Sequence, residues 1–164
     1  MPTNEIRIDN LALSDLDAVV RIYSEVIGLS YVAYGELTEG FATPRGFSKQ
    51  APKLFAKEVR ASIKSSVWCV YVARYKDRLV GFVYVELKKS PAGHRECWIL
   101  DLGVSKKFRR MGIAQRLLAA AYKFGRVRKV KYFFLESGEG NTRAHRLFEK
   151  EGFSPLATIF VKEN

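Results

Sequence analysis

The chain has little cysteine, no long apolar run and no internal repeat, and each absence removes a class of protein. Its two cysteines, Cys69 and Cys97, stand in strand-like runs and match no metal-ligand spacing. We therefore expect no disulfide framework and no metal site, and a reducing cytoplasm is the predicted location. The longest apolar run, Val67 to Ala73, is far short of the ~20 residues that cross a membrane. The first ten residues carry acids and lack an apolar run, which argues against a secretory signal.

Acidic residues are absent from one long stretch, Ser105 to Lys131, although the chain as a whole has a net charge of +11. A basic stripe of this kind attracts polyanions such as a phosphorylated cofactor or a nucleic acid. The alternative is a solvated basic face without a partner. The stripe holds ten basic residues: Lys106, Lys107, Arg109, Arg110, Arg116, Lys123, Arg126, Arg128, Lys129 and Lys131.

The chain contains enough apolar residues to form a folded core. Its 164 residues are 48% hydrophobic and 13% aromatic, which indicates a globular protein and not a disordered segment. That length predicts a single domain over residues 1–164.

The organising stretch is Trp98 to Phe124. It predicts a buried strand over Trp98 to Val104, a basic turn over Ser105 to Met111, and a helix that begins near Gly112. The helix follows from apolar residues at three- and four-residue spacing: Ile113, Leu117, Leu118, Ala121 and Phe124. The free amides and positive dipole of its first turn, with two flanking arginines, would form a phosphate site. An ordinary glycine-containing turn is the alternative.

The other elements follow from periodicity and from breaker residues. We expect a mixed α/β sheet that is antiparallel in the N-terminal half. The last apolar run before the final helix should be buried on both faces, as in a parallel sheet. Predicted strands are Glu5 to Asp9, Val67 to Arg74, Leu79 to Leu87, Val130 to Leu135 and Phe153 to Lys162; predicted helices run from an N-cap at Ser14 to Gly28, from Ser48 to Lys64, and from Asn141 to Gly152.

One segment, Leu29 to Phe47, has no clear period and is rich in glycine and aromatic residues. A long aromatic loop of this kind often binds a ligand, so Tyr31 and Tyr34 are candidate substrate-binding residues. The alternative is that the rings only attach the loop to the core.

Two motifs resemble the GNAT superfamily of acetyl-CoA-dependent N-acetyltransferases. The first, Leu102 to Ala114 (LGVSKKFRRMGIA), matches an aliphatic strand end followed by R/Q-x-x-G-x-G/A. The second, Leu135 to Phe153 (LESGEGNTRAHRLFEKEGF), matches N-x-x-A-x-x-L-Y-x-x-x-G-F at every position but one. The resemblance is strong in the second half of the chain and rests on element order in the first.

The resemblance implies a single mixed sheet flanked by about four helices, with the fourth and fifth strands parallel and splayed around acetyl-CoA. It also implies a role for particular backbone groups. The pantetheine arm would lie along Leu102, Gly103 and Val104, and Asn141 would either bond that arm or cap its own helix. The cofactor pyrophosphate would rest on Arg109, Arg110, Met111, Gly112, Ile113 and Ala114.

Acetyl transfer to an amine needs a base, an oxyanion donor and an acid for the leaving thiolate. Two acids are candidates for the base, Asp101 within the fourth strand and Glu136 at the end of the fifth. The position of Glu136 is similar to that of the glutamate that acts as the base in ribosomal-protein N-terminal acetylases, which are members of this superfamily. The alternatives are a salt bridge or buried hydrogen bond for Asp101 and a solvated strand end for Glu136. The backbone N–H of Leu102 or Val104 is the oxyanion candidate.

Phe148 departs from the motif, because relatives commonly carry a tyrosine there whose hydroxyl protonates the thiolate. Solvent or another hydroxyl would replace it, or the thiolate would leave unassisted, or the protein binds acyl-CoA without efficient turnover. The hydroxyl candidates are Tyr132, Ser137 and Tyr84.

The leading hypothesis is therefore an N-acetyltransferase that acts on a primary amine of unknown identity. The net charge argues mildly against a highly cationic acceptor, unless a local acidic patch overrides it. The alternatives are an acyl-CoA-binding domain with little turnover and a ribosome- or nucleic-acid-associated module, with nucleic acid the less favoured partner. The tail after Phe153 has room for little more than one strand, so the sheet should end in an open edge, which dimerisation would cover.

Overall fold

A computed structural model describes residues 5–162, which form two compact units. The larger unit contains the described residues up to Ile27 together with Lys49–Leu135, and the smaller contains Gly28–Ser48 together with those from Glu136 onward. Within residues 5–162, no helix has both the length and the apolar character that crossing a membrane requires.

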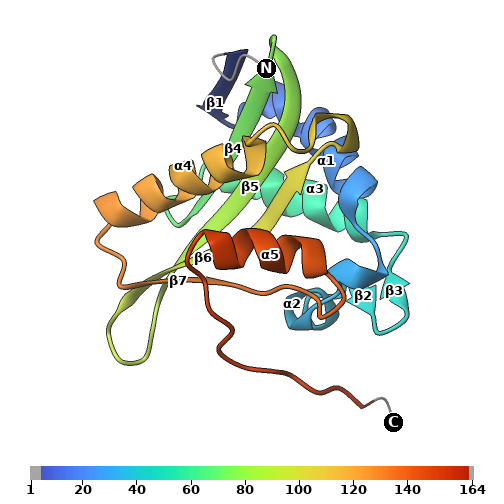
Figure 1. The fold of residues 1–164 in the computed structure, drawn as a ribbon, viewed down its shortest axis with the longest axis vertical. Coiled ribbons are helices and arrows are strands. Elements are labelled where there is room, and N and C mark those ends of the chain that lie inside the picture. Colours follow the sequence, from blue (N-terminus) through green and yellow to red (C-terminus); the bar gives the residue numbers. More distant parts are fainter. Residues whose placement is uncertain (1–4, 163–164) are drawn as a thin grey trace. The chain divides into compact units, whose positions relative to one another are not determined.

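The larger unit is built on a five-stranded sheet in the order β1-β4-β5-β6-β7 (Figure 1). The pairs β1·β4, β4·β5 and β5·β6 are antiparallel, and β6·β7 is parallel. This confirms the mixed sheet, antiparallel in its N-terminal part, that the element order predicts. The strands are β1 (Ile6–Asn10), β4 (Trp68–Tyr75), β5 (Arg78–Lys89), β6 (Arg95–Val104) and β7 (Tyr132–Leu135).

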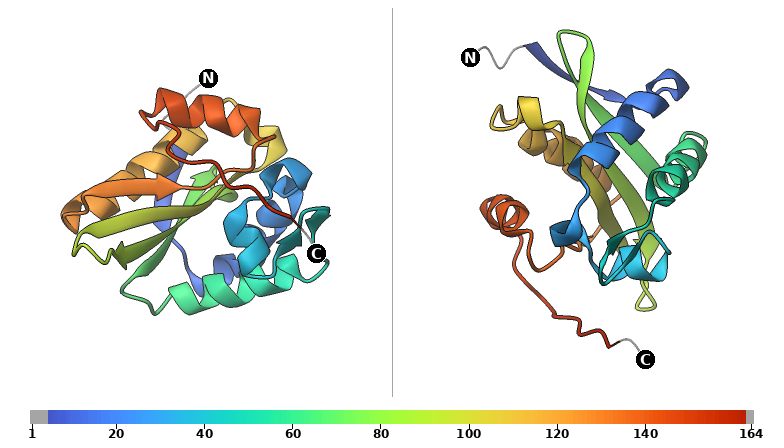
Figure 2. Two further views of the ribbon diagram at one scale, coloured as in Figure 1. Left: turned by 90° about the horizontal axis from the view of Figure 1, so that it is seen from below. Right: turned by 90° about the vertical axis from the view of Figure 1, so that its right-hand side faces the viewer.

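Helices cover both faces of this sheet. Consecutive residues of β5 point to opposite faces: Gly81 lies against Ile113 and Leu117 of α4 (Ile113–Val127), whereas Phe82 packs on Phe55 of α3 (Ala51–Ser62). Helix α1 (Leu16–Val26) shares the face of α3, where Tyr23 stacks on Phe55 with ring centroids 3.9 Å apart. Figure 2 shows α1 and α3 on one side of the sheet and α4 on the other.

The strand β7 lies at the edge of the sheet, close against α4. A Cβ atom on Gly125 of α4 would lie 2.5 Å from the ring of Phe133 in β7, so only glycine permits this approach. The sequence predicted a strand buried on both faces, and that prediction is wrong. Tyr132 is exposed and the next three residues are only half-buried, because an edge strand has a neighbour on one side alone.

The smaller unit contains more regular structure than the sequence indicates. The stretch predicted as a loop, Leu29 to Phe47, folds into four short elements, and the helix predicted after Asn141 is present. The elements are η3 (Leu29–Tyr31), α2 (Tyr34–Thr38), β2 (Ala42–Thr43), β3 (Gly46–Phe47) and α5 (Thr142–Lys150). Each of the four is too short to show a hydrophobic period, which explains why the sequence pattern misses them.

Two further predictions are wrong. A 3₁₀ turn, η2 (Leu13–Asp15), precedes α1, so Asp15 and not Ser14 stands at the start of the helix. Asp15 is buried, accepts a hydrogen bond from the Ala12 amide at 3.0 Å, and pairs with Arg74 at 2.6 Å. The final strand is also absent, because residues 153–162 form neither helix nor strand.

Candidate functional site

The parallel strands β6 and β7 separate partway along their length. Their pairing runs from Glu96 opposite Tyr132 to Ile99 opposite Leu135, and there β7 ends. The next residue of β6, Leu100, is an extra residue against β5, since Val85 pairs with Ile99 and Tyr84 pairs with Asp101. A bulge increases local twist and bends the strand that contains it. The segment Leu100–Val104, to which the resemblance to the superfamily assigns the pantetheine arm, therefore continues beyond its parallel neighbour.

The turn between β6 and α4 adopts an unusual backbone conformation. After the short 3₁₀ helix η4 (Lys106–Phe108), both Arg110 (φ 68°) and Gly112 (φ 73°) are in the left-handed region. Glycine adopts this conformation freely, whereas a residue such as arginine loses about 1–2 kcal/mol. Left-handed residues in such a turn aim successive amides into a concave surface that binds anions.

The first turn of α4 presents amide donors that no side chain of the described residues caps. Gly112 stands at the N-cap position, and the first main-chain bond of the helix runs from the Arg116 amide to the Gly112 carbonyl at 3.2 Å. The amides of Ile113, Ala114 and Gln115 come before that bond and have no partner four residues earlier. The nearest atom to a Cβ built on Gly112 is 3.7 Å away, so the backbone there is open to a ligand. These features fit a diphosphate.

Glu25 of α1 holds the beginning of this turn. Its carboxylate accepts hydrogen bonds from the Lys106 amide at 2.6 Å and from the Ser105 hydroxyl at 3.0 Å. The bond from the Lys106 amide lowers the pKa of Glu25 below its ordinary value of 4.5, and nearby Lys106 and Arg109 act in the same direction. A carboxylate on a preceding helix thus fixes the start of the candidate phosphate turn.

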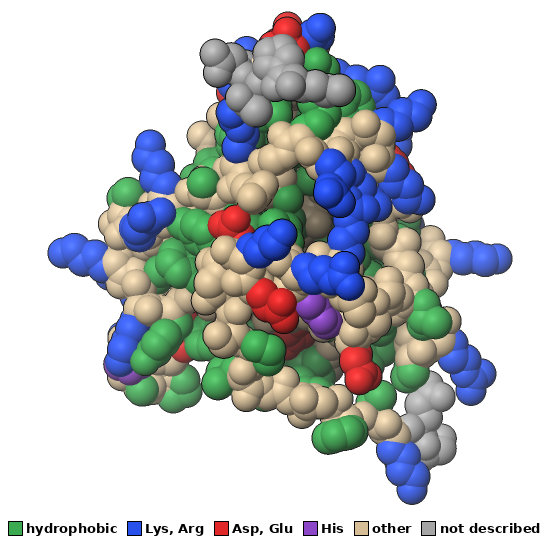
Figure 3. Space-filling view, in the orientation of Figure 1, with side chains coloured by type: hydrophobic (Ala, Val, Ile, Leu, Met, Phe, Trp, Pro, Cys, Tyr) green, Lys and Arg blue, Asp and Glu red, His purple; other side chains and the backbone are tan. Residues whose placement is uncertain are grey.

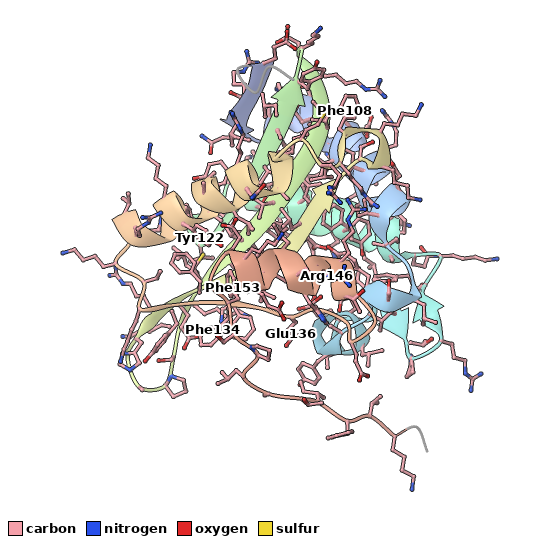
Figure 4. The ribbon with its side chains drawn as sticks, in the orientation of Figure 1. Phe108, Tyr122, Phe134, Glu136, Arg146 and Phe153 are labelled. Atoms are coloured by element: carbon pink, nitrogen blue, oxygen red, sulfur yellow. The ribbon has the colours of Figure 1, made fainter. Side chains whose placement is uncertain are left out.

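Two other contacts attach the same turn to the sheet. The ring of Phe108 packs against Tyr75, with ring centroids 5.8 Å apart, and the Arg78 guanidinium lies 5.5 Å from its centroid. Phe108 is labelled in Figure 4, close to the β4–β5 hairpin. The Nε of Arg109 donates to the Val104 carbonyl at 3.2 Å. The turn is therefore held on both sides while the helix terminus beyond it stays open.

The basic stripe divides into two groups. Arg116 donates to the Ile6 carbonyl, and Arg126 and Arg128 donate to carbonyls within α4, at distances of 3.2 to 3.3 Å. Three residues at or beside the turn, Lys106, Lys107 and Arg110, are exposed. Figure 3 shows lysine and arginine side chains scattered over this face and projecting around its outline. Lys123, Arg126, Lys129 and Lys131 are exposed as well, so exposed positive charge lies both at the turn and along and after α4.

The smaller unit gathers three carboxylates around α2. Glu136, labelled in Figure 4, accepts a hydrogen bond from the Gly35 amide at 2.9 Å and is otherwise exposed. Glu36 accepts one from the Ala33 amide at 2.8 Å. Burial raises the pKa of Glu36, and the charges of Glu136 and Glu39 raise it further. The candidate base Glu136 thus lies in a local acidic cluster, which we define as Glu36, Glu39 and Glu136.

The two segments of the smaller unit meet at Gly138. A Cβ atom there would lie 2.5 Å from the carbonyl oxygen of Ser30 and 2.6 Å from that of Val32. Contacts of this length with backbone cannot be relieved by moving a side chain. Glycine is therefore required for the Glu136–Gly140 loop to lie against η3, and this approach places Glu136 beside α2.

The smaller unit also contains the other residues that the sequence analysis proposes for cofactor binding, substrate binding or proton transfer. Asn141 precedes α5, but its side chain makes no capping hydrogen bond, so the structure does not show it acting as a side-chain cap. Tyr31 packs near Phe47, another ring of the same segment, with centroids 6.4 Å apart, whereas Tyr34 is exposed. Phe148 packs edge-on against Phe153. The buried hydroxyl of Ser137 has no hydrogen-bond partner among residues 5–162.

The other acid, Asp101, lies on β6 opposite Tyr84, which is buried. No group of three His, Cys, Asp or Glu side chains in the described chain could hold a metal ion. Both cysteines are free thiols, and burial raises the pKa of Cys97 to about 12, so this thiol is a poor nucleophile at neutral pH.

Sequence reasoning missed two residues, Glu25 and Glu36. Glu25 acts on residues 80 and 81 positions later, so no local pattern announces it. Glu36 carries a local signal, because a carboxylate three residues after a helix start commonly bonds the amide at the start. That signal was obscured by the aperiodic stretch around it.

Comparison with known proteins identifies the fold. A profile described as the acetyltransferase (GNAT) family matches residues 35–153, well over half of the chain. Among curated protein sequences, none matches this chain significantly.

Three solved structures illustrate the likeness. A mutant of the BH1408 protein from Bacillus halodurans is 18% identical, with a TM-score of 0.79 over 96% of this chain and 99% of that one. The aminoglycoside N-acetyltransferase AAC(6')-Iy in complex with CoA is 12% identical, with a TM-score of 0.73 over 97% and 94%. The aminoglycoside acetyltransferase meta-AAC0020, from an uncultured soil metagenomic sample and in complex with sisomicin, is 16% identical, with a TM-score of 0.68 over 98% of each chain.

Proposed function

The chain belongs to the GNAT acetyltransferase family, and from that premise we propose that it transfers an acetyl group from acetyl-CoA to a primary amine by direct attack in a ternary complex. The observation that carries the proposal is the start of α4, where an anchored turn leaves main-chain donors uncapped by any described side chain. A helix start of this kind binds phosphate through its amides and through the helix dipole.

The turn residues Arg109 to Ala114 would hold the pyrophosphate of the cofactor. Gly112 would let the phosphates approach the backbone, while the side chain of Arg110 adds positive charge at the surface. The pantetheine arm would follow Leu102, Gly103 and Val104, the part of β6 that continues beyond the end of β7. Asn141, whose side chain makes no capping bond, would bond the same arm.

The thioester of acetyl-CoA supplies the acetyl group. Glu136 would accept the proton that the amine loses, and the Gly35 amide fixes the direction of its carboxylate. Asp101 is the alternative base. A main-chain N–H of Leu102 or Val104 would stabilise the negative charge that develops on the acetyl oxygen. Solvent or one of the hydroxyls of Tyr132, Ser137 and Tyr84 would protonate the thiolate.

A small, multiply charged amine is the acceptor that the smaller unit favours. The acidic cluster lies around α2, whose first residue, Tyr34, is exposed. Carboxylates attract ammonium groups by charge, and an exposed aromatic ring attracts them by cation–π contact. This local charge is opposite in sign to the net charge of +11, so the argument from net charge does not decide the acceptor. Aminoglycosides belong to this chemical class, and two of the similar structures are enzymes of that name.

Two measurements test the proposal in sequence. Acetyl-CoA at 100 times its dissociation constant should stabilise the protein by about 2.7 kcal/mol in thermal denaturation. Release of free thiol is then measured with acetyl-CoA and a panel containing an aminoglycoside, a linear polyamine, a lysine peptide and a peptide N-terminus. Thiol release with the aminoglycoside or the polyamine supports the acceptor class. No stabilisation by acetyl-CoA would refute the cofactor site.

Two variants distinguish the two candidate bases, Glu136 and Asp101. Glu136→Gln keeps an acceptor for the Gly35 amide but cannot take a proton, so kcat should fall by about 10²- to 10⁴-fold with little change in acetyl-CoA affinity. Asp101→Asn is the matched variant on β6. If Asp101→Asn shows the larger loss of kcat, Asp101 is the base and Glu136 is not.

Phe148 favours a second candidate, an acyl-CoA-binding domain with little turnover. The residue has a ring but no hydroxyl, and it packs against Phe153 with a centroid distance of 6.0 Å. In that case acetyl-CoA stabilises the protein, but no amine in the panel releases thiol above the rate in buffer.

A further inference from the structure

The C-terminal end of α4 is closed by a lysine at a position where helices usually have glycine. The Lys129 amide donates to the Arg126 carbonyl at 3.0 Å, and the Val130 amide donates to the Gly125 carbonyl at 3.1 Å. In this pair of bonds, the Schellman motif, the residue after the cap is left-handed. Lys129 occupies that position with φ of 55°. Because a side chain makes this conformation unfavourable, the chain keeps a positive charge here at a cost in backbone strain.

Two further cations lie opposite each other on the adjoining hairpin. Lys89 of β5 pairs with Arg95 of β6, and both are exposed. Like charges directly opposite each other destabilise a sheet. The Arg95 guanidinium donates to the Arg128 carbonyl at 3.1 Å, and the Arg95 carbonyl accepts the Lys131 amide at 2.8 Å. These contacts bring the hairpin, the end of α4 and the start of β7 together (Figure 1).

We define the basic end of the larger unit as five exposed cations: Lys89, Arg95, Arg126, Lys129 and Lys131. Among the described residues, no carboxylate forms an ion pair with any of the five. The Nζ of Lys131 instead lies 3.4 Å from the Nε2 of His94. The dipole of α4 gives a structural reason for Arg126 and Lys129, whereas Lys89 lies on β5 and Lys131 lies before β7. An anionic partner would relieve all of these like charges.

The acids near the hairpin loop have other partners. Glu86 pairs with Lys88 at 3.0 Å, and Glu96 accepts the indole N–H of Trp98 at 3.0 Å. The positive charge of the basic end is therefore available to a ligand.

An exposed aromatic ring adjoins these cations. Tyr132 begins β7 and is 44% exposed, and the Nζ of Lys131 lies 5.1 Å from its ring centroid. Proteins hold single-stranded nucleic acid with this combination, because bases stack on aromatic rings while cations bind the phosphates. A duplex keeps its bases inside, and an anionic bilayer or an acidic peptide has none. The ring therefore favours a single strand over those partners.

We propose that the basic end binds single-stranded nucleic acid, with phosphates on the five cations and a base stacked on Tyr132. This site is separate from the phosphate turn at the other end of the helix. Because α4 has 15 residues, its two ends are roughly 22 Å apart. That distance exceeds two Debye lengths of about 8 Å at physiological salt, so the two sites are electrostatically independent. The proposal goes beyond acetyl transfer and does not depend on it.

The experiment measures fluorescence anisotropy of labelled single strands of about 12 nucleotides, one RNA and one DNA, between about 50 and 200 mM salt. Both should bind, since phosphate and base are the groups recognised. If each cation neutralises one phosphate, the logarithm of affinity should fall against the logarithm of salt with a slope of about −3.5. Affinity should then drop about 100-fold across this range.

A double variant, Lys129→Asn with Lys131→Gln, removes two of the five cations. Asparagine tolerates the left-handed conformation, so the helix end should keep its fold. The slope should change to about −2.1. The matched control is Lys53→Gln with Lys57→Gln, which removes the same charge from two exposed positions on α3. The control should keep the wild-type slope.

Tyr132→Leu separates stacking from charge. It should weaken binding about five-fold or more and leave the slope unchanged, because stacking on a base does not depend on salt. Unchanged affinity in this variant, or tighter binding of a duplex or of anionic lipid vesicles than of the single strand, would overturn the proposal in favour of a partner recognised by charge alone. Absence of binding at 50 mM salt would also overturn it. A loss of slope in Lys106→Gln with Lys107→Gln equal to that of the first double variant would place the strand at the phosphate turn instead.

Discussion

Replacing Glu25 by glutamine tests whether a residue outside the candidate phosphate turn determines its shape. The carboxylate of Glu25 accepts the Lys106 amide at 2.6 Å and the Ser105 hydroxyl at 3.0 Å. Glutamine keeps one oxygen as an acceptor and removes the charge. Hydrogen bonds to charged groups contribute about 1.5–3 kcal/mol and neutral ones about 0.5–1.5, so we expect a loss of about 1 kcal/mol in the free energy of unfolding.

The same change has two opposite effects on acetyl-CoA affinity. If the turn is less ordered in the free variant, the cofactor must order it on binding. This ordering costs up to the same ~1 kcal/mol, which raises Kd about five-fold. Removing a negative charge near a phosphate site lowers Kd. Salt screens that second effect, however, with a Debye length of about 8 Å at physiological ionic strength. Loss of order should therefore dominate at 0.15 M salt, and the variant should bind acetyl-CoA three- to five-fold more weakly.

The assay is calorimetric titration of acetyl-CoA at low and at 0.15 M salt, with urea denaturation of the same samples. Asp17→Asn, an exposed position in the first turn of α1, removes the same charge and serves as the control. It should change Kd little at 0.15 M salt. Tighter binding by Glu25→Gln at 0.15 M salt would refute the argument from order, since charge would then be the larger effect.

The pKa of Glu25 adds a dependence on pH. Because the folded protein lowers this pKa from 4.5, the ionised carboxylate stabilises the fold. That contribution is complete above the ordinary pKa and is lost as pH falls through the lowered value. The difference in stability between wild type and Glu25→Gln should thus be constant near pH 7 and disappear in acid.

Three other predictions follow from single contacts. Gly138→Ala should lower the free energy of unfolding in urea by about 1–3 kcal/mol, because its Cβ meets two backbone carbonyls; Gly28→Ala, with no atom within 4 Å, should not. Burial raises the pKa of Glu36 in the folded protein. The ionised carboxylate therefore destabilises the fold at a pH above this raised pKa, and the effect is absent at a pH below the pKa of the unfolded chain. Glu36→Gln should accordingly match or exceed the wild-type Tm at pH 8, lose any advantage at pH 4, and raise KM for a polycationic amine. Phe148→Tyr should retain or raise kcat, and a large loss would show that a hydroxyl at that position has no room.

The strand, the turn and the helix start that carry the proposed cofactor site could be predicted because they are local in sequence. The strand, the turn and the start of α4 occupy consecutive residues, and Gly112 adopts the left-handed conformation that the motif requires. The element boundaries of β6 and α4 differ from the predicted ones by at most three residues. A periodic apolar pattern and one glycine were sufficient there.

Elsewhere the pattern failed for two physical reasons. The short elements between Leu29 and Phe47 contain too few residues to show a period. Gly138, which lies more than 100 positions after the Ser30 and Val32 carbonyls that it meets, determines how that segment packs. The final strand was predicted from composition that does favour a strand. A strand also needs a neighbour for its backbone, and the main-chain hydrogen bonds of the described chain give none to residues 154–162. Composition indicates what a segment can become, whereas the partner decides whether it does.

This difference bears on how the phosphate turn of the larger unit and the acidic cluster of the smaller unit respond to mutation. The phosphate turn is held by Glu25, Phe108 and Arg109, each through a different contact, so the loss of one leaves two others in place. The acidic cluster depends on one approach of two backbone segments at Gly138. Substitutions near the turn should therefore change cofactor affinity gradually. Substitutions in Gly28–Ser48 or in the loop that contains Gly138 should instead change acceptor preference abruptly while acetyl-CoA binding persists.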